Sequence, residues 1–143
     1  MTHIISNIYL GNLYDADDDD FLNNNKIKHI IRLTENDNVL TYAKTIKAYT
    51  FNISDIESEA DRLYNLLPKI YNILKNIPKN ENVLIHCNVG MSRSPTVVIY
   101  YIMKMGKIND YDKVLKFVKD KRSIVNPNVG FQKSLKENEN NLL

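Results

Sequence analysis

One stretch of the sequence decides the fold: His86-Cys87-Asn88-Val89-Gly90-Met91-Ser92-Arg93-Ser94. It follows Val83-Leu84-Ile85, a short apolar run typical of a central strand covered on both faces, and it precedes Pro95 to Met105, which has the pattern of a helix. A loop that leaves a buried strand and enters a helix can aim successive backbone N–H groups at an anion. The stretch therefore predicts a phosphate-binding loop.

Three residues of this loop suit chemistry on a phosphate group. The helix dipole and the loop amides favour a thiolate over a thiol, so Cys87 is expected to be the nucleophile. Arg93 carries a planar fork that matches two phosphate oxygens at once, and Gly90 permits backbone angles that a side chain would oppose. We expect the phosphate to be bound by Asn88, Val89, Gly90, Met91, Ser92 and Arg93.

Outward from the loop, the chain alternates short strands with helices, which is an α/β pattern. Further strands are expected at Ile4 to Leu10, before a turn at Gly11-Asn12, at Lys28 to Leu33 and at Ile46 to Ile53.

Helices are expected from Asp15 to about Asn24, unless this acidic run is a solvated loop, and over Leu63 to Ile77, with a kink or two abutting segments at Pro68. Further helices are expected over Pro95 to Met105 with Ser94 as N-cap, over Tyr111 to Lys121, and from about Val129.

Composition limits the classes of protein. The chain has 143 residues, of which 43% are apolar, and this suits one domain spanning 1–143. The formal net charge is only +2 and the lysines are dispersed, so we expect neither nucleic acid nor an anionic membrane as the main partner. No apolar run approaches the length of a membrane span, and the N-terminus lacks the order of a secretory signal. We expect a cytoplasmic protein, in the host cytoplasm or the virion if the source is a virus.

The chain has a single cysteine, so an internal disulfide is ruled out and Cys87 is a candidate for chemistry. We expect no metal site and no cofactor. His3 and His29 have no partners in the sequence, and we expect both to be structural.

The loop resembles the His-Cys-x-x-Gly-x-x-Arg-Ser signature of cysteine-dependent protein tyrosine phosphatases, and with Pro95 it looks most like the dual-specificity branch. The resemblance implies a mostly parallel sheet of about four to five strands flanked by helices. It also implies hydrolysis of phosphotyrosine, phosphoserine and phosphothreonine in phosphoprotein substrates, through a phosphocysteine and without metal. It says nothing about oligomeric state.

The resemblance extends over nearly the whole chain. Ile8-Tyr9-Leu10-Gly11 looks like the opening strand of the family, Ile27 to Leu33 looks like its second strand, and Arg122 to Phe131 is similar to its Pro-Asn-x-Gly-Phe element. Two departures stand out: Ser134-Leu135 replaces the usual Gln-Leu, and Arg32 stands where an asparagine is common.

A leaving group must be protonated as it departs, and the natural donor is a carboxylic acid on a mobile loop over the site. The candidates are Asp55, Glu57, Glu59 and Asp61, and the resemblance implies Asp55. It also implies that Ser94 helps the cysteine leave, a role that can coexist with capping of the helix. By the same resemblance, His86 supports the loop. Asn128 either hydrogen-bonds near the loop or forms a turn beside Pro127.

Rival interpretations remain at this point. A low-molecular-weight tyrosine phosphatase would have its loop near the N-terminus, a phosphoinositide phosphatase would be expected to carry lysines inside the loop, and an RNA 5'-triphosphatase more often has Arg-Thr-Gly. From another class, a phosphopeptide-binding module could keep the anion site without turnover, although the presence of Cys87, Arg93 and Asp55 together argues against it.

Overall fold

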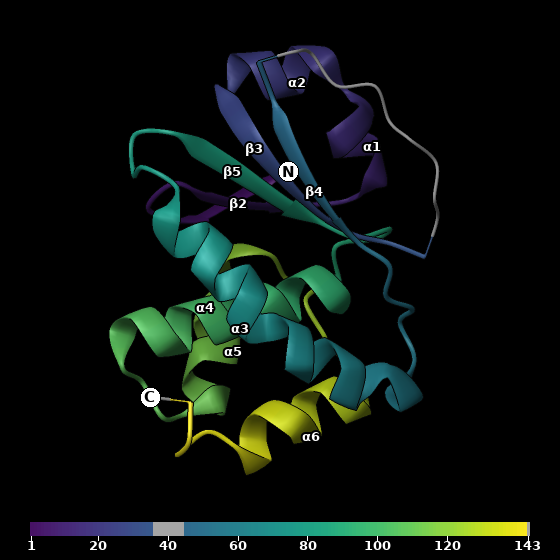
Figure 1. The fold of residues 1–143 in the computed structure, drawn as a ribbon, viewed down its shortest axis with the longest axis vertical. Helices are drawn as coiled ribbons and strands as arrows, with labels where there is room; N and C mark the ends of the chain where they lie inside the picture. Colours follow the sequence, from purple (N-terminus) through teal and green to yellow (C-terminus); the bar gives the residue numbers. More distant parts are fainter. Residues whose placement is uncertain (36–44, 143) are drawn as a thin grey trace.

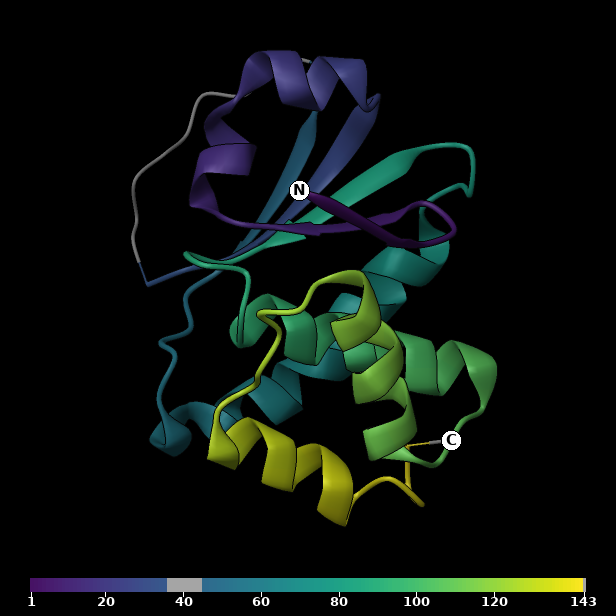
Figure 2. The same ribbon diagram turned by 180° about the vertical axis from the view of Figure 1, so that it is seen from behind.

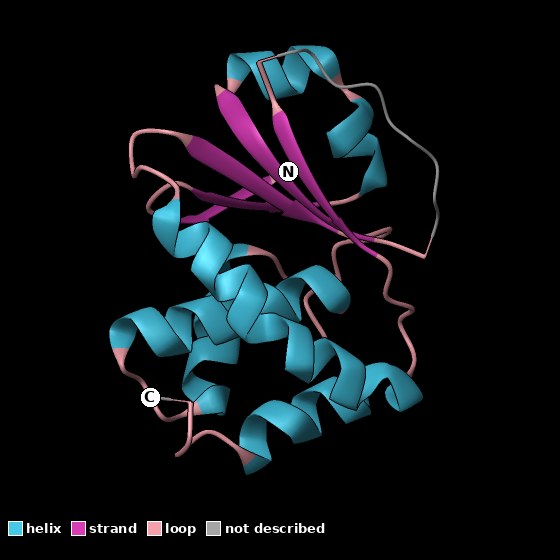
Figure 3. Cartoon of the chain, in the orientation of Figure 1, coloured by secondary structure: helices cyan, strands magenta, loops and turns pink. Residues whose placement is uncertain are grey.

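The computed structural model describes residues 1–35 and 45–142 and shows a five-stranded sheet in the order β1-β2-β5-β3-β4 (Figures 1 and 3). The strands are β1 (Thr2–Ile5), β2 (Ile8–Gly11), β3 (Ile27–Leu33), β4 (Lys47–Phe51) and β5 (Asn82–His86). All neighbouring strands run parallel except β1 and β2, which are antiparallel. The mostly parallel α/β sheet expected above is confirmed.

The helices lie on both faces of the sheet (Figures 1 and 2). One face is covered by α1 (Leu13–Asp17) and α2 (Asp19–Asn24). The other carries α3 (Ala60–Asn76), α4 (Arg93–Gly106), α5 (Tyr111–Lys121) and α6 (Val129–Glu137), with a single 3₁₀ turn, η1 (Glu57–Glu59), before α3. Because β5 is central and covered on both faces, Val83, Leu84 and Ile85 are fully buried.

Three elements differ from the sequence predictions. The strand expected at Ile4 to Leu10 is two strands, joined by a turn in which Ser6 has a φ of 51°. The acidic helix is divided at Asp18, whose side chain caps α2 by accepting from Phe21 N. The two abutting segments considered at Pro68 do not occur, because α3 is one helix, and Pro68 lies on its exposed side.

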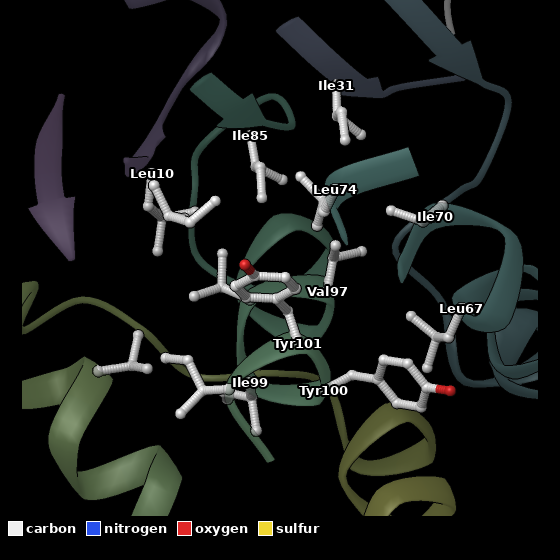
Figure 4. Packing of buried hydrophobic residues seen from close by; sticks show 14 of the residues in the cluster. Leu10, Ile31, Leu67, Ile70, Leu74, Ile85, Val97, Ile99, Tyr100 and Tyr101 are labelled. Atoms are coloured by element: carbon white, nitrogen blue, oxygen red, sulfur yellow. The ribbon is translucent and has the colours of Figure 1, made fainter. Parts of the chain in front are cut away.

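The central helix α4 is buried on every side, from Arg93 to Met103. A helix buried all round requires apolar residues at nearly every position, which explains the run Val97 to Met103. Figure 4 shows Leu10, Ile31 and Ile85 from the sheet facing Val97 and Tyr101 of α4, with Leu67, Ile70 and Leu74 of α3 beside them. No helix among residues 1–35 and 45–142 is both long and apolar enough to cross a bilayer.

The four parallel strands end at one edge of the sheet, at Gly11, Leu33, Phe51 and His86. Ligands of open α/β sheets bind outside the carboxyl ends of the strands. Because β5 is central and leads directly to the buried α4, the loop between them is held at both ends by the core.

Candidate active site

The loop between β5 and α4 surrounds the sulfur of Cys87. This residue is 2% exposed, its Sγ accepts a hydrogen bond from Gly90 N at 3.3 Å, and it lies 3.1 Å from Ser94 Oγ. The sulfur therefore sits at the start of α4, where the helix dipole and a loop amide both stabilise negative charge.

Gly90 is required by the geometry of the loop. Its φ is 77°, in the left-handed region, and a Cβ at this position would lie 2.6 Å from the carbonyl oxygen of Gly11. A side chain is thus opposed both by the backbone angles and by the close approach of β2.

The loop is braced from outside by hydrogen bonds to its carbonyl oxygens. Arg122 donates from Nε to Gly90 O at 3.1 Å and from Nη2 to Val89 O at 3.2 Å. Leu13 N donates to Asn88 O at 3.0 Å. No role was predicted for Arg122 from the sequence, although it is one of only four arginines in the chain and begins the Pro-Asn element.

Arg93 is buried, and its guanidinium nitrogens differ in their contacts. Its Nη1 donates to Ile53 O at 2.9 Å and lies 3.5 Å from Glu35 Oε1. Its Nε is buried and has no hydrogen-bond partner in the described part of the chain. A buried donor without a partner is costly, and a bound oxyanion would satisfy it. The contact with Glu35 was not predicted, because it joins segments far apart in the sequence.

Asp55 follows β4 and is connected to the phosphate loop through Asn128. The side-chain amide of Asn128 donates to Asp55 Oδ1 at 2.9 Å, and its backbone N donates to Ser92 Oγ at 2.8 Å. Asn128 also caps α6, since its Oδ1 accepts from Phe131 N. The hydrogen bond near the loop that was considered for Asn128 is therefore present, whereas in place of a turn beside Pro127 the residue is the N-cap of α6.

The other acidic candidates lie at the start of α3. Glu57 and Glu59 form η1, Asp61 is in the first turn of α3, and Glu59 pairs with Arg62 at 3.0 Å. None of these three has a hydrogen bond to the phosphate loop among those found in the described residues.

The N-cap of α4 is Ser92 and not Ser94, so the capping prediction for Ser94 is wrong. Ser94 lies inside the first turn and is fully buried, and its hydroxyl faces Cys87 Sγ. The hydroxyl of Ser92 does not cap the helix either, because it accepts from Asn128 N.

His86 is neutral under ordinary conditions, because burial lowers its pKa to about 4. Its Nδ1 lies 3.1 Å from Cys87 O, and since a carbonyl only accepts, Nδ1 carries the proton. A neutral imidazole adds no positive charge beside the sulfur, and the hydrogen bond of Nδ1 is to the backbone of the loop. Among the described residues, no three His, Cys, Asp or Glu side chains gather in a group that could bind a metal.

The two departures noted above lie outside these contacts. Ser134 Oγ donates to Gly130 O within α6. Arg32 is 3% exposed, pairs with His86 across the parallel strands, and donates from Nε to Thr34 Oγ1 at 3.2 Å. Its charge contributes to lowering the pKa of His86, after burial.

The sequence is similar to known phosphatases over nearly its full length. The family model described as "Dual specificity phosphatase, catalytic domain" matches residues 8–141. Protein 123R of Invertebrate iridescent virus 6, provisionally named a tyrosine phosphatase, is 40% identical over 96% of this chain and 91% of its own length. Dual specificity protein phosphatase 15 of Mus musculus is 36% identical over 96% of this chain, which spans only 57% of that relative.

Solved structures agree with this similarity. The crystal structure of DUSP15 matches with a TM-score of 0.82 and 32% identity, covering 97% of this chain and 86% of that one. The crystal structure of human DUSP28 matches with a TM-score of 0.86 over 99% of this chain and 97% of that one; at 21% identity it supports the fold alone. The chain therefore belongs to the dual specificity phosphatase family, and it is a protein phosphatase of the tyrosine and dual-specificity class.

Proposed function

We propose that this chain hydrolyses phosphotyrosine, phosphoserine and phosphothreonine in proteins through a phosphocysteine at Cys87, without a metal ion. One observation carries the proposal. At the start of α4, a sulfur that accepts a loop N–H lies within the same loop as a buried arginine whose Nε has no protein partner in the described residues. A nucleophile and an unsatisfied donor for a phosphoryl oxygen are thus held together.

In the first step, Cys87 Sγ attacks phosphorus, so an S–P bond forms while the P–O bond to the substrate breaks. Asp55 gives its proton to the departing oxygen. Arg93 and the backbone N–H groups of residues 88–92 bind the phosphoryl oxygens, and these donors supply the positive charge that the transition state needs.

In the second step, water attacks phosphorus and loses a proton to Asp55, and the S–P bond breaks to release inorganic phosphate and the thiolate. Ser94 Oγ, 3.1 Å from the sulfur, donates a hydrogen bond to the thiolate as it forms. Each group thereby returns to its starting protonation state.

The physiological partners in this proposal are phosphoproteins, and the location is the cytoplasm, where a lone cysteine nucleophile stays reduced. Dual specificity rests on family analogy.

The test combines turnover with trapping of the intermediate. Wild type should release phosphate from p-nitrophenyl phosphate at the same rate with and without a chelator, and rapid acid quench should give a phosphate adduct on the Cys87 peptide by mass spectrometry. Cys87→Ser should give neither turnover nor adduct. Binding of phosphopeptides without any turnover in wild type would favour a binding module, and turnover confined to RNA 5'-triphosphates or phosphoinositides would replace the substrate class.

A further inference from the structure

Several exposed apolar side chains stand next in sequence to residues that are hydrogen-bonded into the site, and four of these side chains are more than half exposed. They are Tyr14, Ile56, Val89 and Val129, with exposed fractions of 82%, 52%, 54% and 66%, and we call them the apolar rim. Single exposed apolar residues are ordinary on a protein surface. Four around one site call for a physical explanation.

Two members of the apolar rim belong to the phosphate-loop side. Val89 is part of the loop itself, and Arg122 holds its carbonyl oxygen. Tyr14 follows Leu13, whose N–H donates to Asn88 O at 3.0 Å. Both side chains are therefore attached to backbone that is fixed relative to Cys87.

The other two members belong to the acid side. Ile56 follows Asp55, and Val129 follows Asn128, which donates to Asp55. The two segments are in close contact, because a Cβ on Gly130 would lie 2.7 Å from Glu57 O. Ile56 and Val129 are thus the exposed sequence neighbours of the proposed general acid and of the residue that binds it.

Charges of both signs lie beside the apolar rim. Glu57 is exposed directly after Ile56, whereas Lys133 and Lys136 line a hollow together with Val129. These charges therefore favour neither an acidic nor a basic residue beside the phosphorylated one. An apolar residue at that place would bury part of the rim.

We propose that the apolar rim selects phosphorylated segments in which the residues flanking the phosphorylated one are apolar. This inference rests on the proposed function, and it specifies which phosphorylated segments the enzyme prefers. Burial of part of two or three rim side chains is expected to give about a tenfold advantage in kcat/KM.

The test compares four phosphotyrosine peptides of equal length that differ only in the residues flanking the phosphotyrosine. These flanking residues are Leu and Val in the first peptide, Ser in the second, Glu in the third and Lys in the fourth. The Leu/Val peptide should exceed the Ser peptide by about tenfold in kcat/KM, and neither the Glu nor the Lys peptide should exceed the Ser peptide. Equal rates for all four peptides, or a best rate with Glu or with Lys, would overturn the inference and leave the proposed function standing. No turnover of any peptide or of p-nitrophenyl phosphate would overturn the proposed function itself.

Substitutions in the apolar rim test whether its side chains cause the preference between peptides. In Ile56→Ser and Val129→Ser the ratio of kcat/KM between the Leu/Val and Ser peptides should fall about threefold each. Because the measured quantity is a ratio of kcat/KM values, a general loss of activity that affects both peptides equally would leave it unchanged. Phe21→Ser is the matched control, because Phe21 is 48% exposed but lies on α2, which lines a cavity with Ile27 and Asn80 at the opposite edge of the sheet. Its ratio should equal that of wild type, and a fall as large as in Ile56→Ser would refute the assignment.

Discussion

The side-chain amide of Asn128 donates a hydrogen bond of 2.9 Å to Asp55 Oδ1, and this bond ties the loop after β4 to the start of α6. The backbone N of Asn128 holds Ser92 Oγ at 2.8 Å, so the same residue also contacts the phosphate loop. From the sequence, the acid was expected on a mobile loop over the site. In the structure this loop is packed against α6, where Gly130 leaves room for Glu57.

The proposed general acid can be tested through the leaving group. Asp55→Ala should lower kcat on phosphotyrosine peptides by about a hundredfold, since general acids contribute on that order, and it should lower turnover of aryl phosphates with good leaving groups much less. The alkaline fall of the pH–rate profile should flatten in this variant. Glu57→Ala and Glu59→Ala are the controls. If either shows this pattern and Asp55→Ala does not, the acid has been misassigned.

Asn128 is expected to act by positioning Asp55. Asn128→Asp keeps an oxygen that can cap α6 but replaces the N–H donor with a carboxylate facing Asp55. It should lower kcat on phosphotyrosine peptides by about tenfold, with little change in the free energy of unfolding. In an Asp55→Ala background the same change should have no further effect. Additive losses in the double variant would show that Asn128 acts by another route.

The loop itself was predictable from the sequence, because its determinants are local. The apolar run of β5, the signature residues and the start of a helix are neighbours along the chain, and the sheet and α4 follow from them. The bracing contacts were not predictable. Arg122 reaches Val89 and Gly90, and Glu35 reaches Arg93, across separations that no periodicity encodes.

The error over Ser94 has a similar physical origin. Ser94 precedes Pro95, and a serine before a proline is a strong local signal for an N-cap. The helix instead begins two residues earlier, with Ser92 as N-cap. Tertiary contacts determine the roles of the two serine hydroxyls. Ser92 Oγ accepts a hydrogen bond from Asn128 N, and Ser94 Oγ faces Cys87 Sγ.

Gly90→Ala should damage both folding and turnover. The left-handed φ of 77° and the 2.6 Å approach of a Cβ to Gly11 O both oppose the new methyl group. We expect the free energy of unfolding to fall by about 1 to 3 kcal/mol, measured by urea titration, and kcat/KM to fall with it. Gly106→Ala in α4 is the control, since its Cβ would meet only the side chain of Ile108. Equal effects of the two variants would contradict the role given to Gly90.

His86 makes stability depend on pH in a defined direction. Its pKa is lowered from 6.5 to about 4 in the fold, so between these values the unfolded state binds more protons and stability decreases as pH falls. The full loss between pH 6.5 and 4 corresponds to about 3 kcal/mol. Urea titrations at several pH values should show this slope in wild type and in His3→Asn, and a weaker slope in His86→Asn. An unchanged slope in His86→Asn would assign the effect to other groups.

The last prediction concerns oxidation of Cys87. A sulfur activated as a nucleophile for phosphorus also reacts with peroxide, giving a sulfenic acid. The chain has no second cysteine, so this product can react only with a backbone nitrogen, an external thiol or more peroxide. Low peroxide should therefore inactivate the enzyme reversibly when thiol is added, and without thiol the Cys87 peptide should gain one and then two oxygens by mass spectrometry. Full activity after peroxide that inactivates a related phosphatase would mean that Cys87 is not the activated nucleophile.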